Sequence, residues 1–343
     1  MDKLYKRLKE ISQIKEYEIN PEIPSKNLLI EVTNRCNCSC IFCANSKMMR
    51  KRKYINKDLV KKVLTEAYDL GVKEVGFYTT GESLLDPSLS SYIRLAKEIG
   101  YEYVYLTTNG ILLNEEKAKE IIDAGIDSIK ISINAINRED YKFIHGVDYY
   151  DVVFDNLKKL YDYRKNKKLS FNIFVSYIAT RYTDYAINDI KNHFIDYCDE
   201  VAVVNVRNQS GMMPEINKML SCKKEEGKFE SKRLVPCHYV FDTINVTSEG
   251  YLTACCTDFE NYLAYADLNK ISLKEAWNNK TITELRKKHL KNELDGTLCY
   301  NCIYDSCVEP MPLSREFVET ETLNNAFESN IVIKRLKSNN KML

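Results

Sequence analysis

The sequence predicts an α/β fold, in which a parallel sheet is followed by a smaller region rich in cysteine. Between residues 27 and 207, short runs rich in β-branched and aromatic residues alternate six times with longer amphipathic segments. After residue 236 this alternation stops, and the remaining cysteine-containing part is too short for a second full α/β domain. We therefore expect one large domain and one small one.

Six strand candidates, each followed by a helix candidate, make up the large domain. The strands are expected at residues 27–32, 74–79, 103–108, 128–134, 171–177 and 201–207. The helices are expected near residues 57–70, 87–99, 114–124, 137–145, 151–166 and 184–197. Serial β-then-α units form a parallel sheet with crossover helices, and the sites of such folds lie at the carboxyl ends of the strands.

The chain divides into five expected segments. They are an N-terminal helix and lead-in at 1–26, the core at 27–210, a linker at 211–236, the small domain at 237–320 and a polar tail at 321–343.

Composition is that of a soluble cytoplasmic protein. Apolar residues make up 44% and charged residues 29% of 343 residues, and the net charge of +1 gives no reason to expect a nucleic-acid or membrane partner. No apolar run is long enough to span a membrane, and the first residues are charged rather than signal-like. In a reducing compartment, twelve cysteines with close spacings indicate metal binding rather than disulfides.

The first cysteine group follows the first strand. The stretch EVTNRCNCSCIFCA holds Cys36, Cys40 and Cys43 in a Cys-x3-Cys-x2-Cys pattern, with Cys38 between them. Three such thiolates can ligate three irons of a [4Fe–4S] cube and leave the fourth iron open. The alternative is a zinc site, which needs four ligands. Cys38 could be the fourth, but in an extended loop its side chain would point away.

These cysteines and the polar residues at the next strand ends resemble the signature of radical S-adenosylmethionine (SAM) enzymes. Phe42 stands just before the third cysteine, as in that family. Thr80-Gly81-Glu82 matches the family's Gly-Gly-Glu motif with Thr in the first place. Asn109, Ser132 and Asn134 match positions that hold the ribose and the methionine carboxylate of SAM.

The resemblance implies a partial (β/α)6, TIM-like barrel that cleaves SAM reductively at a [4Fe–4S] cluster. The product is a 5′-deoxyadenosyl radical, which abstracts hydrogen from a substrate. Glu82 would accept from the methionine amine. Lys142 or His145 stands where the family often has a cation for the methionine carboxylate. An external one-electron reductant of flavodoxin or ferredoxin type is implied as a partner.

The second cysteine group lies in the small domain. Gly250 suits a tight turn between strands at 241–246 and 251–254, which would bring Cys237 and Cys255 together. Cys299-x2-Cys302 supplies two more thiolates. Four cysteines suit either structural zinc or a fully ligated [4Fe–4S] cluster, and their spacing does not choose between them.

This arrangement resembles the SPASM domain of radical SAM enzymes, and more closely its shortened twitch form. The full domain binds two auxiliary clusters through seven cysteines, whereas here no cysteine follows Cys307. The resemblance implies one auxiliary [4Fe–4S] cluster held by Cys237, Cys255, Cys299 and Cys302, with Cys307 spare or a substitute.

The expected reaction is oxidation of a small polar, sugar-like substrate, with the auxiliary cluster as electron acceptor. Such a twitch cluster is similar to that of the radical SAM dehydrogenase that oxidises an aminocyclitol alcohol. Arg207 and Cys256 are the candidate catalytic residues, Arg207 as a substrate-holding cation and Cys256 as a hydrogen donor or proton carrier. One alternative is a maturase of ribosomally made peptides. Another is a non-catalytic iron–sulfur or zinc module, which would have no use for the polar strand ends.

Overall fold

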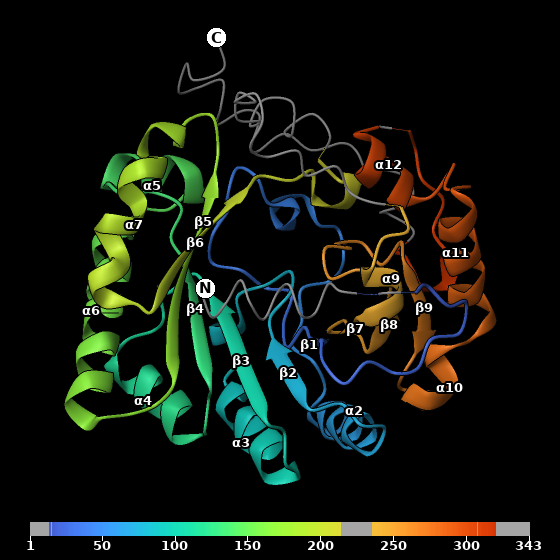
Figure 1. Ribbon diagram of the computed structural model, residues 1–343, viewed down its shortest axis with the longest axis horizontal. Helices are drawn as coiled ribbons and strands as arrows, with labels where there is room; N and C mark the ends of the chain where they lie inside the picture. Colours follow the sequence, from blue (N-terminus) through green and yellow to red (C-terminus); the bar gives the residue numbers. More distant parts are fainter. Residues whose placement is uncertain (1–13, 15, 214–234, 307, 320–343) are drawn as a thin grey trace.

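The computed structural model describes residue 14 and residues 16–213, 235–306 and 308–319 (Figure 1). Several sequence-based expectations fall outside these residues: the N-terminal helix, most of the 211–236 linker, Cys307 and the 321–343 tail.

A single sheet of nine strands runs through the described part of the chain, in the order β6-β5-β4-β3-β2-β1-β7-β8-β9. Its strands are β1 (Leu28–Ile30), β2 (Glu74–Phe77), β3 (Tyr103–Thr108), β4 (Ser128–Ser132), β5 (Asn172–Ala179), β6 (Glu200–Asn205), β7 (Ile244–Val246), β8 (Tyr251–Thr253) and β9 (Ala264–Asp267).

Strands β1 to β6 are parallel and stand in sequence order. The apolar residues of β1 are at most 4% exposed, as expected for a parallel strand that is covered on both faces. This confirms the expected α/β fold with a parallel sheet. The sheet is open, because its outer strands β6 and β9 do not pair with each other.

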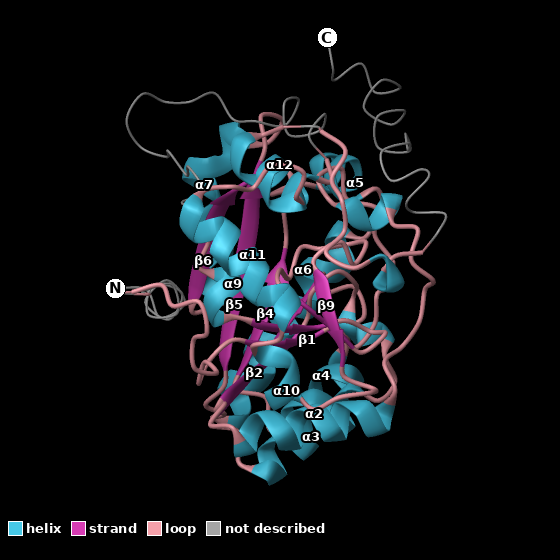
Figure 2. Ribbon diagram, turned by 90° about the vertical axis from the view of Figure 1, so that its right-hand side faces the viewer, coloured by secondary structure: helices cyan, strands magenta, loops and turns pink. Residues whose placement is uncertain are grey.

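Helices cover the outer side of β1 to β6 and surround β7 to β9 (Figures 1 and 2). The α-helices of the large part are α2 (Lys57–Asp69), α3 (Leu89–Ile99), α4 (Glu115–Asp123), α5 (Arg138–His145), α6 (Tyr150–Lys167) and α7 (Ile187–Phe194). Those of the small part are α9 (Tyr239–Asp242), α10 (Leu273–Trp277), α11 (Lys280–Lys291) and α12 (Leu298–Tyr304). None of the described helices could span a membrane.

The small cysteine-rich part continues the sheet of the large one. β7 pairs in parallel with β1, with Leu29 opposite Asn245, and β8 and β9 follow in antiparallel register. Gly250 forms the expected turn between β7 and β8 with φ +94°, and a Cβ atom there would lie 2.5 Å from Leu59 Cδ2. The hairpin therefore has a fixed position relative to β1, from whose end the first cysteine loop leaves.

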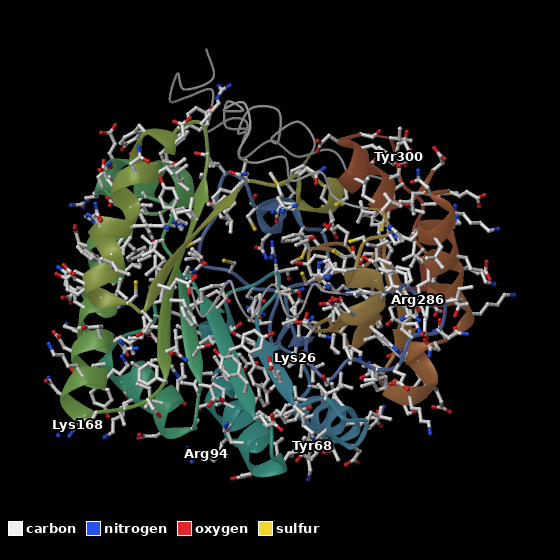
Figure 3. The ribbon with its side chains drawn as sticks, in the orientation of Figure 1. Lys26, Tyr68, Arg94, Lys168, Arg286 and Tyr300 are labelled. Atoms are coloured by element: carbon white, nitrogen blue, oxygen red, sulfur yellow. The ribbon has the colours of Figure 1, made fainter. Side chains whose placement is uncertain are left out.

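A buried cation anchors the helices of the small part. Arg286 of α11, labelled in Figure 3, is 0% exposed and lies 4.7 Å from the ring centroid of Trp277. Its Nε donates to the carbonyl of Val240 at 3.0 Å, which ties α11 to α9. The cysteines on these elements are thus carried by a packed scaffold.

Candidate functional site

The first cysteine loop is held by the carboxyl end of α5. The amide of Ser39 donates to the carbonyl of His145 at 3.0 Å, and that of Ile41 donates to Ile144 at 2.9 Å. The last carbonyls of a helix lack partners within the helix, so the loop satisfies them. Cys36, Cys40 and Cys43 are half-buried within this loop. None of the ten described cysteines forms a disulfide.

The side chain of Cys38 does not point away from its neighbours. Its amide lies 3.5 Å from Cys36 Sγ, and hydrogen bonding of its thiol with those of Cys36 and Cys40 raises the pKa of Cys38 far above the ordinary value. The chain bends at Asn37 and turns again at residues 41–42, so the loop is not extended. The expectation based on strand-like alternation is therefore wrong, because the Cys38 thiol lies beside those of Cys36 and Cys40.

Gly81 allows the second strand end to pack on the backbone that leads into the cysteines. A Cβ atom at this position would lie 2.2 Å from the carbonyl oxygen of Thr33 and 2.6 Å from that of Arg35. The next amide, that of Glu82, donates to the carbonyl of Arg35 at 2.7 Å. A residue with a side chain would force the two loops apart.

Glu82 joins the ends of the second and third strands. It is 3% exposed and accepts hydrogen bonds from Thr108 Oγ1 at 2.7 Å, Asn109 N at 2.7 Å and Leu84 N at 3.1 Å. Burial raises its pKa in spite of these donors. A carboxylate has about four acceptor sites, so Glu82 can still accept from an ammonium group.

Thr80 takes part in a buried ionic network. Its hydroxyl donates to the carboxylate of Glu31, which also receives Arg50 Nη2 at 2.8 Å and the amide of Ser248 at 3.0 Å. Although burial opposes ionisation, Arg50 and the hydroxyl donors hold the pKa of Glu31 below its ordinary value. The Thr that departs from the Gly-Gly-Glu pattern is therefore explained by its bond to Glu31.

The same network joins the two parts of the molecule. Arg50, 2% exposed, donates from Nη1 to Glu249 at 2.9 Å and to Asn261 at 2.7 Å. Glu260 in turn accepts the amides of Met49 and Arg50, at 2.6 Å and 3.2 Å. A segment close behind the first cysteine loop is thus fixed to the region that carries the second group.

The carboxyl ends of the parallel strands form one edge of the sheet, called the rim below. The remaining polar residues expected near SAM lie on this rim, and each has a hydrogen-bond partner within the protein. Asn109 Nδ2 donates to Oδ1 of Asn37 in the cysteine loop at 2.7 Å, and Ser132 Oγ lies 3.2 Å from Ser176 Oγ. Asn134 is 2% exposed and its Oδ1 accepts from the amide of Ile178 at 2.7 Å. Phe42, 6% exposed, packs into the core.

Tyr141 is a residue that the sequence reasoning missed. Of the two residues suggested for the methionine carboxylate, Lys142 is 67% exposed and pairs with Asp148, and the ring of His145 is occupied by Asn134 and Cys40. Tyr141 is 0% exposed, and its hydroxyl has no hydrogen-bond partner among the described residues.

The Tyr141 hydroxyl lies near the cysteine loop. Its ring stacks on His145 with centroids 4.2 Å apart. Burial raises the pKa of Tyr141 above its ordinary value, and the nearby Cys38 and Cys40 raise it further. The hydroxyl therefore keeps its proton and can donate a hydrogen bond. Its position four residues before His145, on the same helix face, was the signal available in the sequence.

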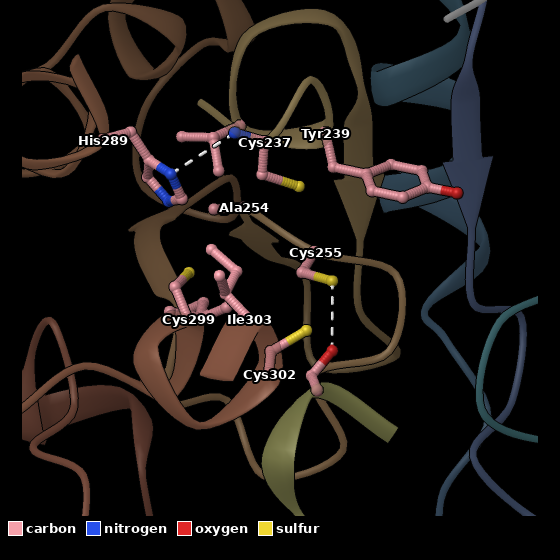
Figure 4. Close-up of a pocket in the computed structure, with 11 residues that line it drawn as sticks. Cys237, Tyr239, Ala254, Cys255, His289, Cys299, Cys302 and Ile303 are labelled. Atoms are coloured by element: carbon pink, nitrogen blue, oxygen red, sulfur yellow. Dashed lines mark hydrogen bonds between the residues drawn. The ribbon is translucent and has the colours of Figure 1, made fainter. Parts of the chain in front are cut away.

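The second cysteine group lines one cavity of about 310 Å³, a volume that includes space open to solvent (Figure 4). Cys237, Cys255, Cys299 and Cys302 all contribute to its wall. Cys299 and Cys302 lie on α12 three residues apart, and this spacing places both thiols on one helix face.

The rest of the cavity wall is mainly apolar. Val240, Ala254, Leu263 and Ile303 line it, together with Tyr239, His289 and Ser210, whose Oγ lies 3.4 Å from Cys255 Sγ. Burial lowers the pKa of His289 to about 4, so this ring adds no charge near neutral pH. Four thiols around an apolar space fit a fully ligated iron–sulfur cluster.

Among the described residues, no three or more Cys, His, Asp or Glu side chains lie close enough together to bind a single metal ion. Around one zinc ion, sulfur ligands stand about 4 Å apart, since each Zn–S bond is about 2.3 Å. The ligands of a four-iron cube are spread more widely, because each binds a different iron.

The two candidate catalytic residues, Arg207 and Cys256, are distant in sequence from the first cysteine loop. Arg207 is exposed and follows the end of β6. Cys256 is half-buried and lines a second cavity of about 190 Å³ that is shared with Glu31, Asn245 and Cys255. Cys256 therefore shares a cavity with Glu31 of the ionic network and with Cys255 of the second group.

Family models match both parts of the chain. Residues 30–178 match the radical SAM superfamily, and residues 237–303 match the SPASM iron–sulfur cluster-binding domain.

Relatives in sequence match over part of their length. The chain is 33% identical over 189 residues to the protein MJ0804 of Methanocaldococcus jannaschii, covering 54% of this chain and 59% of that protein. It is 35% identical over 139 residues to a probable GTP 3′,8-cyclase of Saccharolobus solfataricus, covering 40% of this chain and 44% of that protein. The chain thus spans about half the length of these relatives.

Solved structures share the fold at low identity. BtrN in complex with AdoMet and 2-DOIA is 16% identical, with a TM-score of 0.54, over 82% of this chain and 93% of BtrN. Streptococcus suis SuiB bound to precursor peptide SuiA is 14% identical, with a TM-score of 0.60, over 82% of this chain and 69% of SuiB. Native anSMEcpe with bound AdoMet is 15% identical, with a TM-score of 0.58, over 92% of this chain and 98% of anSMEcpe.

Proposed function

Because this chain belongs to the radical SAM superfamily and carries a SPASM iron–sulfur domain, we propose that this radical SAM enzyme oxidises a small polar, sugar-like substrate. The observation that carries the proposal is the cavity lined by four cysteines, one of which, Cys255, also lines the second cavity together with Thr80 at the end of the second strand. A cluster held by four cysteines has no open iron for a substrate to coordinate, which suits it to electron transfer.

In this proposal Cys36, Cys40 and Cys43 ligate the SAM-binding [4Fe–4S] cluster. Cys237, Cys255, Cys299 and Cys302 ligate one auxiliary [4Fe–4S] cluster, with Cys307 spare or a substitute. When bound, the first cluster with SAM would supply a radical that abstracts hydrogen, and the auxiliary cluster would supply an acceptor for the electron that the substrate loses.

The residues of the rim would bind and orient SAM. Glu82 accepts from the methionine ammonium, for which its remaining lone pairs are available. Tyr141 donates its otherwise unpartnered hydroxyl to the methionine carboxylate, the role for which Lys142 is too exposed. Asn109, Ser132 and Asn134 line the rim on the ribose side.

Two residues would act on the substrate side. Arg207 holds an anionic or hydroxyl group of the substrate through its guanidinium. Cys256, beside Cys255 in the second cavity, would carry away the proton that the substrate loses on oxidation. Both roles can be tested by whether substitution changes product formation without changing SAM cleavage.

The test is anaerobic turnover of the reconstituted chain with SAM, dithionite and a panel of deuterated aminocyclitols and sugar alcohols. The expected result is deuterium in 5′-deoxyadenosine and a product two hydrogens lighter than the substrate. Cleavage of SAM without deuterium transfer from any polyol, but with transfer from a peptide, would contradict the proposed substrate class.

Peptide modification is the second candidate. One observation favours it: anSMEcpe with bound AdoMet and Cp18Cys peptide matches over 93% of this chain with a TM-score of 0.56. The same deuterium-transfer assay with peptides separates the two functions, because the label reaches 5′-deoxyadenosine only from the true substrate.

We also propose that an acidic external reductant, of flavodoxin or ferredoxin type, docks beside the first cysteine loop. Lys51 and Lys53 are exposed, and their backbones are tied to Asn34, two residues before Cys36, at 2.9 Å and 2.8 Å. Exposed Arg35 lies against the same segment, with Nη2 3.2 Å from the carbonyl of Arg52. A basic surface close to the cluster would steer an acidic partner to it.

A further inference from the structure

His145 lies between the strand-end rim and the first cysteine loop. It is the last residue of α5 and is 1% exposed. Its Nε2 lies 3.2 Å from the backbone nitrogen of Asn134 and 3.2 Å from Asn134 Nδ2. Its Nδ1 lies 3.5 Å from Cys40 Sγ. Both ring nitrogens therefore have polar neighbours within the protein.

The partners of His145 determine which ring nitrogen carries the proton. A backbone N–H can only donate, so the amide of Asn134 requires Nε2 to accept. The side-chain amide of Asn134 is oriented by the amide of Ile178, which donates to its Oδ1 at 2.7 Å. Asn134 Nδ2 therefore also donates to Nε2. A neutral imidazole with an accepting Nε2 carries its proton on Nδ1, which faces Cys40.

We infer that His145 is a positioning residue that donates an Nδ1–H hydrogen bond to the Cys40 thiolate and thereby raises the reduction potential of the cluster held by Cys40. The inference rests on the proposed role of Cys40 as an iron ligand. Hydrogen bonds to cluster sulfurs tune the potential, and a donor favours the reduced state because that state carries more negative charge.

The ring acts separately from the backbone that holds the loop. The bonds from Ser39 and Ile41 reach the carbonyls of His145 and Ile144, so they survive a change of side chain. The ring itself is positioned by stacking on Tyr141 at an interplanar angle of 18°. Phenylalanine at position 145 can keep this stacking while it removes both nitrogens.

The experiment is a redox titration of the reconstituted full chain, followed by electron paramagnetic resonance of the signal that SAM alters. In His145→Phe we expect the ratio of reduced to oxidised cluster at a fixed solution potential to fall roughly tenfold. For one electron this equals a shift of about 59 mV to more negative potential. The signal that SAM does not alter should keep its potential.

A matched control is His193→Phe. His193 also stacks on an aromatic ring, that of Phe154, with centroids 5.2 Å apart, and its Nε2 lies 2.8 Å from Tyr150 Oη. We expect no shift of either signal in this variant. An unchanged potential in His145→Phe, or an equal shift of both signals, would overturn the inference.

A measurement on the unaltered sequence covers the case in which His145→Phe does not load iron. The chain has four histidines, so labelling with ¹⁵N-histidine is selective. Pulsed resonance at the SAM-sensitive signal should detect a weak ¹⁵N coupling, transmitted through the hydrogen bond, and no coupling would refute the bond. A SAM-sensitive signal that persists in Cys40→Ala would instead refute Cys40 as a ligand, which separates failure of the proposed function from failure of the hydrogen bond.

Discussion

The two cysteine groups are built in opposite ways. The first places four thiols within eight residues of one loop, surrounded by hydrogen-bonding groups from β-strand ends and from α5. The second collects four thiols from segments up to 65 residues apart and surrounds them with a mainly apolar wall, in which the hydroxyls of Ser210 and Thr257 lie beside Cys255. A polar rim suits binding of a charged cofactor at an exposed metal, whereas an apolar enclosure suits a cluster that only exchanges electrons.

The largest expected effect comes from removing one cysteine of each group. Cys40→Ala should abolish formation of 5′-deoxyadenosine and lower the iron content from about eight to about four per chain, since each cluster holds four irons. Cys302→Ala should lose a similar amount of iron but keep SAM cleavage. Iron analysis and chromatography of the nucleoside products check both. Loss of SAM cleavage in Cys302→Ala alone would reverse the assignment of the two groups.

Breaking the ionic network between the groups should reduce the stability of both sites. Arg50→Met leaves Glu31 charged and unpaired at 2% exposure, which we expect to cost about 3–5 kcal/mol. The double variant Glu31→Leu/Arg50→Met should recover most of this loss. Denaturant unfolding followed by circular dichroism measures it. As a control, Lys97→Met removes a half-exposed pair with Asp127 and should cost at most about 1 kcal/mol. Equal losses in the two single variants would contradict the role of Arg50.

Tyr141→Phe removes only one hydroxyl at the polar rim. We expect the Kd for SAM to rise roughly ten- to a hundredfold, because the lost bond is to a charged group and such bonds contribute about 1.5–3 kcal/mol. Stability should be unchanged, since the hydroxyl has no partner among the described residues. Tyr101→Phe is the matched control, because its hydroxyl donates at 2.9 Å to the carbonyl of Leu64 in α2 and its loss should affect stability alone. Isothermal titration with SAM decides, and an unchanged Kd in Tyr141→Phe would exclude the contact.

The smallest effect is expected at the surface beside the first cysteine loop. Lys51→Glu/Lys53→Glu should slow reduction by flavodoxin several-fold at low salt and have no effect on reduction by dithionite, because only the protein reductant needs to dock. Lys287→Glu on α11 serves as the control. Stopped-flow absorbance measures the rates. Equal rates with flavodoxin for both variants would place the docking surface elsewhere.

The contrast between the groups also explains what the sequence could predict. The spacing of Cys36, Cys40 and Cys43 is a local feature, and local spacing survives folding, so this loop could be recognised before the structure was known. The six parallel strands were recognised because buried β-rich runs alternate with amphipathic segments. The strand β9 and the helices α11 and α12 were not expected, because β9 and α12 are only four and seven residues long, α11 is mostly polar, and the burial of all three depends on partners distant in the chain.

Contacts between distant residues account for most of what sequence reasoning missed. From the sequence, Thr80 is only a departure from the Gly-Gly-Glu motif, whereas in the structure its hydroxyl donates to the carboxylate of Glu31. The bend at Asn37 reversed the expected direction of Cys38. His145 and Tyr141 lie on a helix about 100 residues after the cysteine loop, and their approach to Cys40 depends on how α5 packs against that loop.

The most direct test of the account is electron paramagnetic resonance of the anaerobically reduced, reconstituted chain with and without SAM. Because only the loop with three proposed ligands leaves an iron open, we expect two [4Fe–4S] signals, of which SAM alters one. That altered signal should be missing from Cys40→Ala and present in Cys302→Ala. A SAM-induced change in both signals, in neither, or in the one that depends on Cys302 would contradict the account.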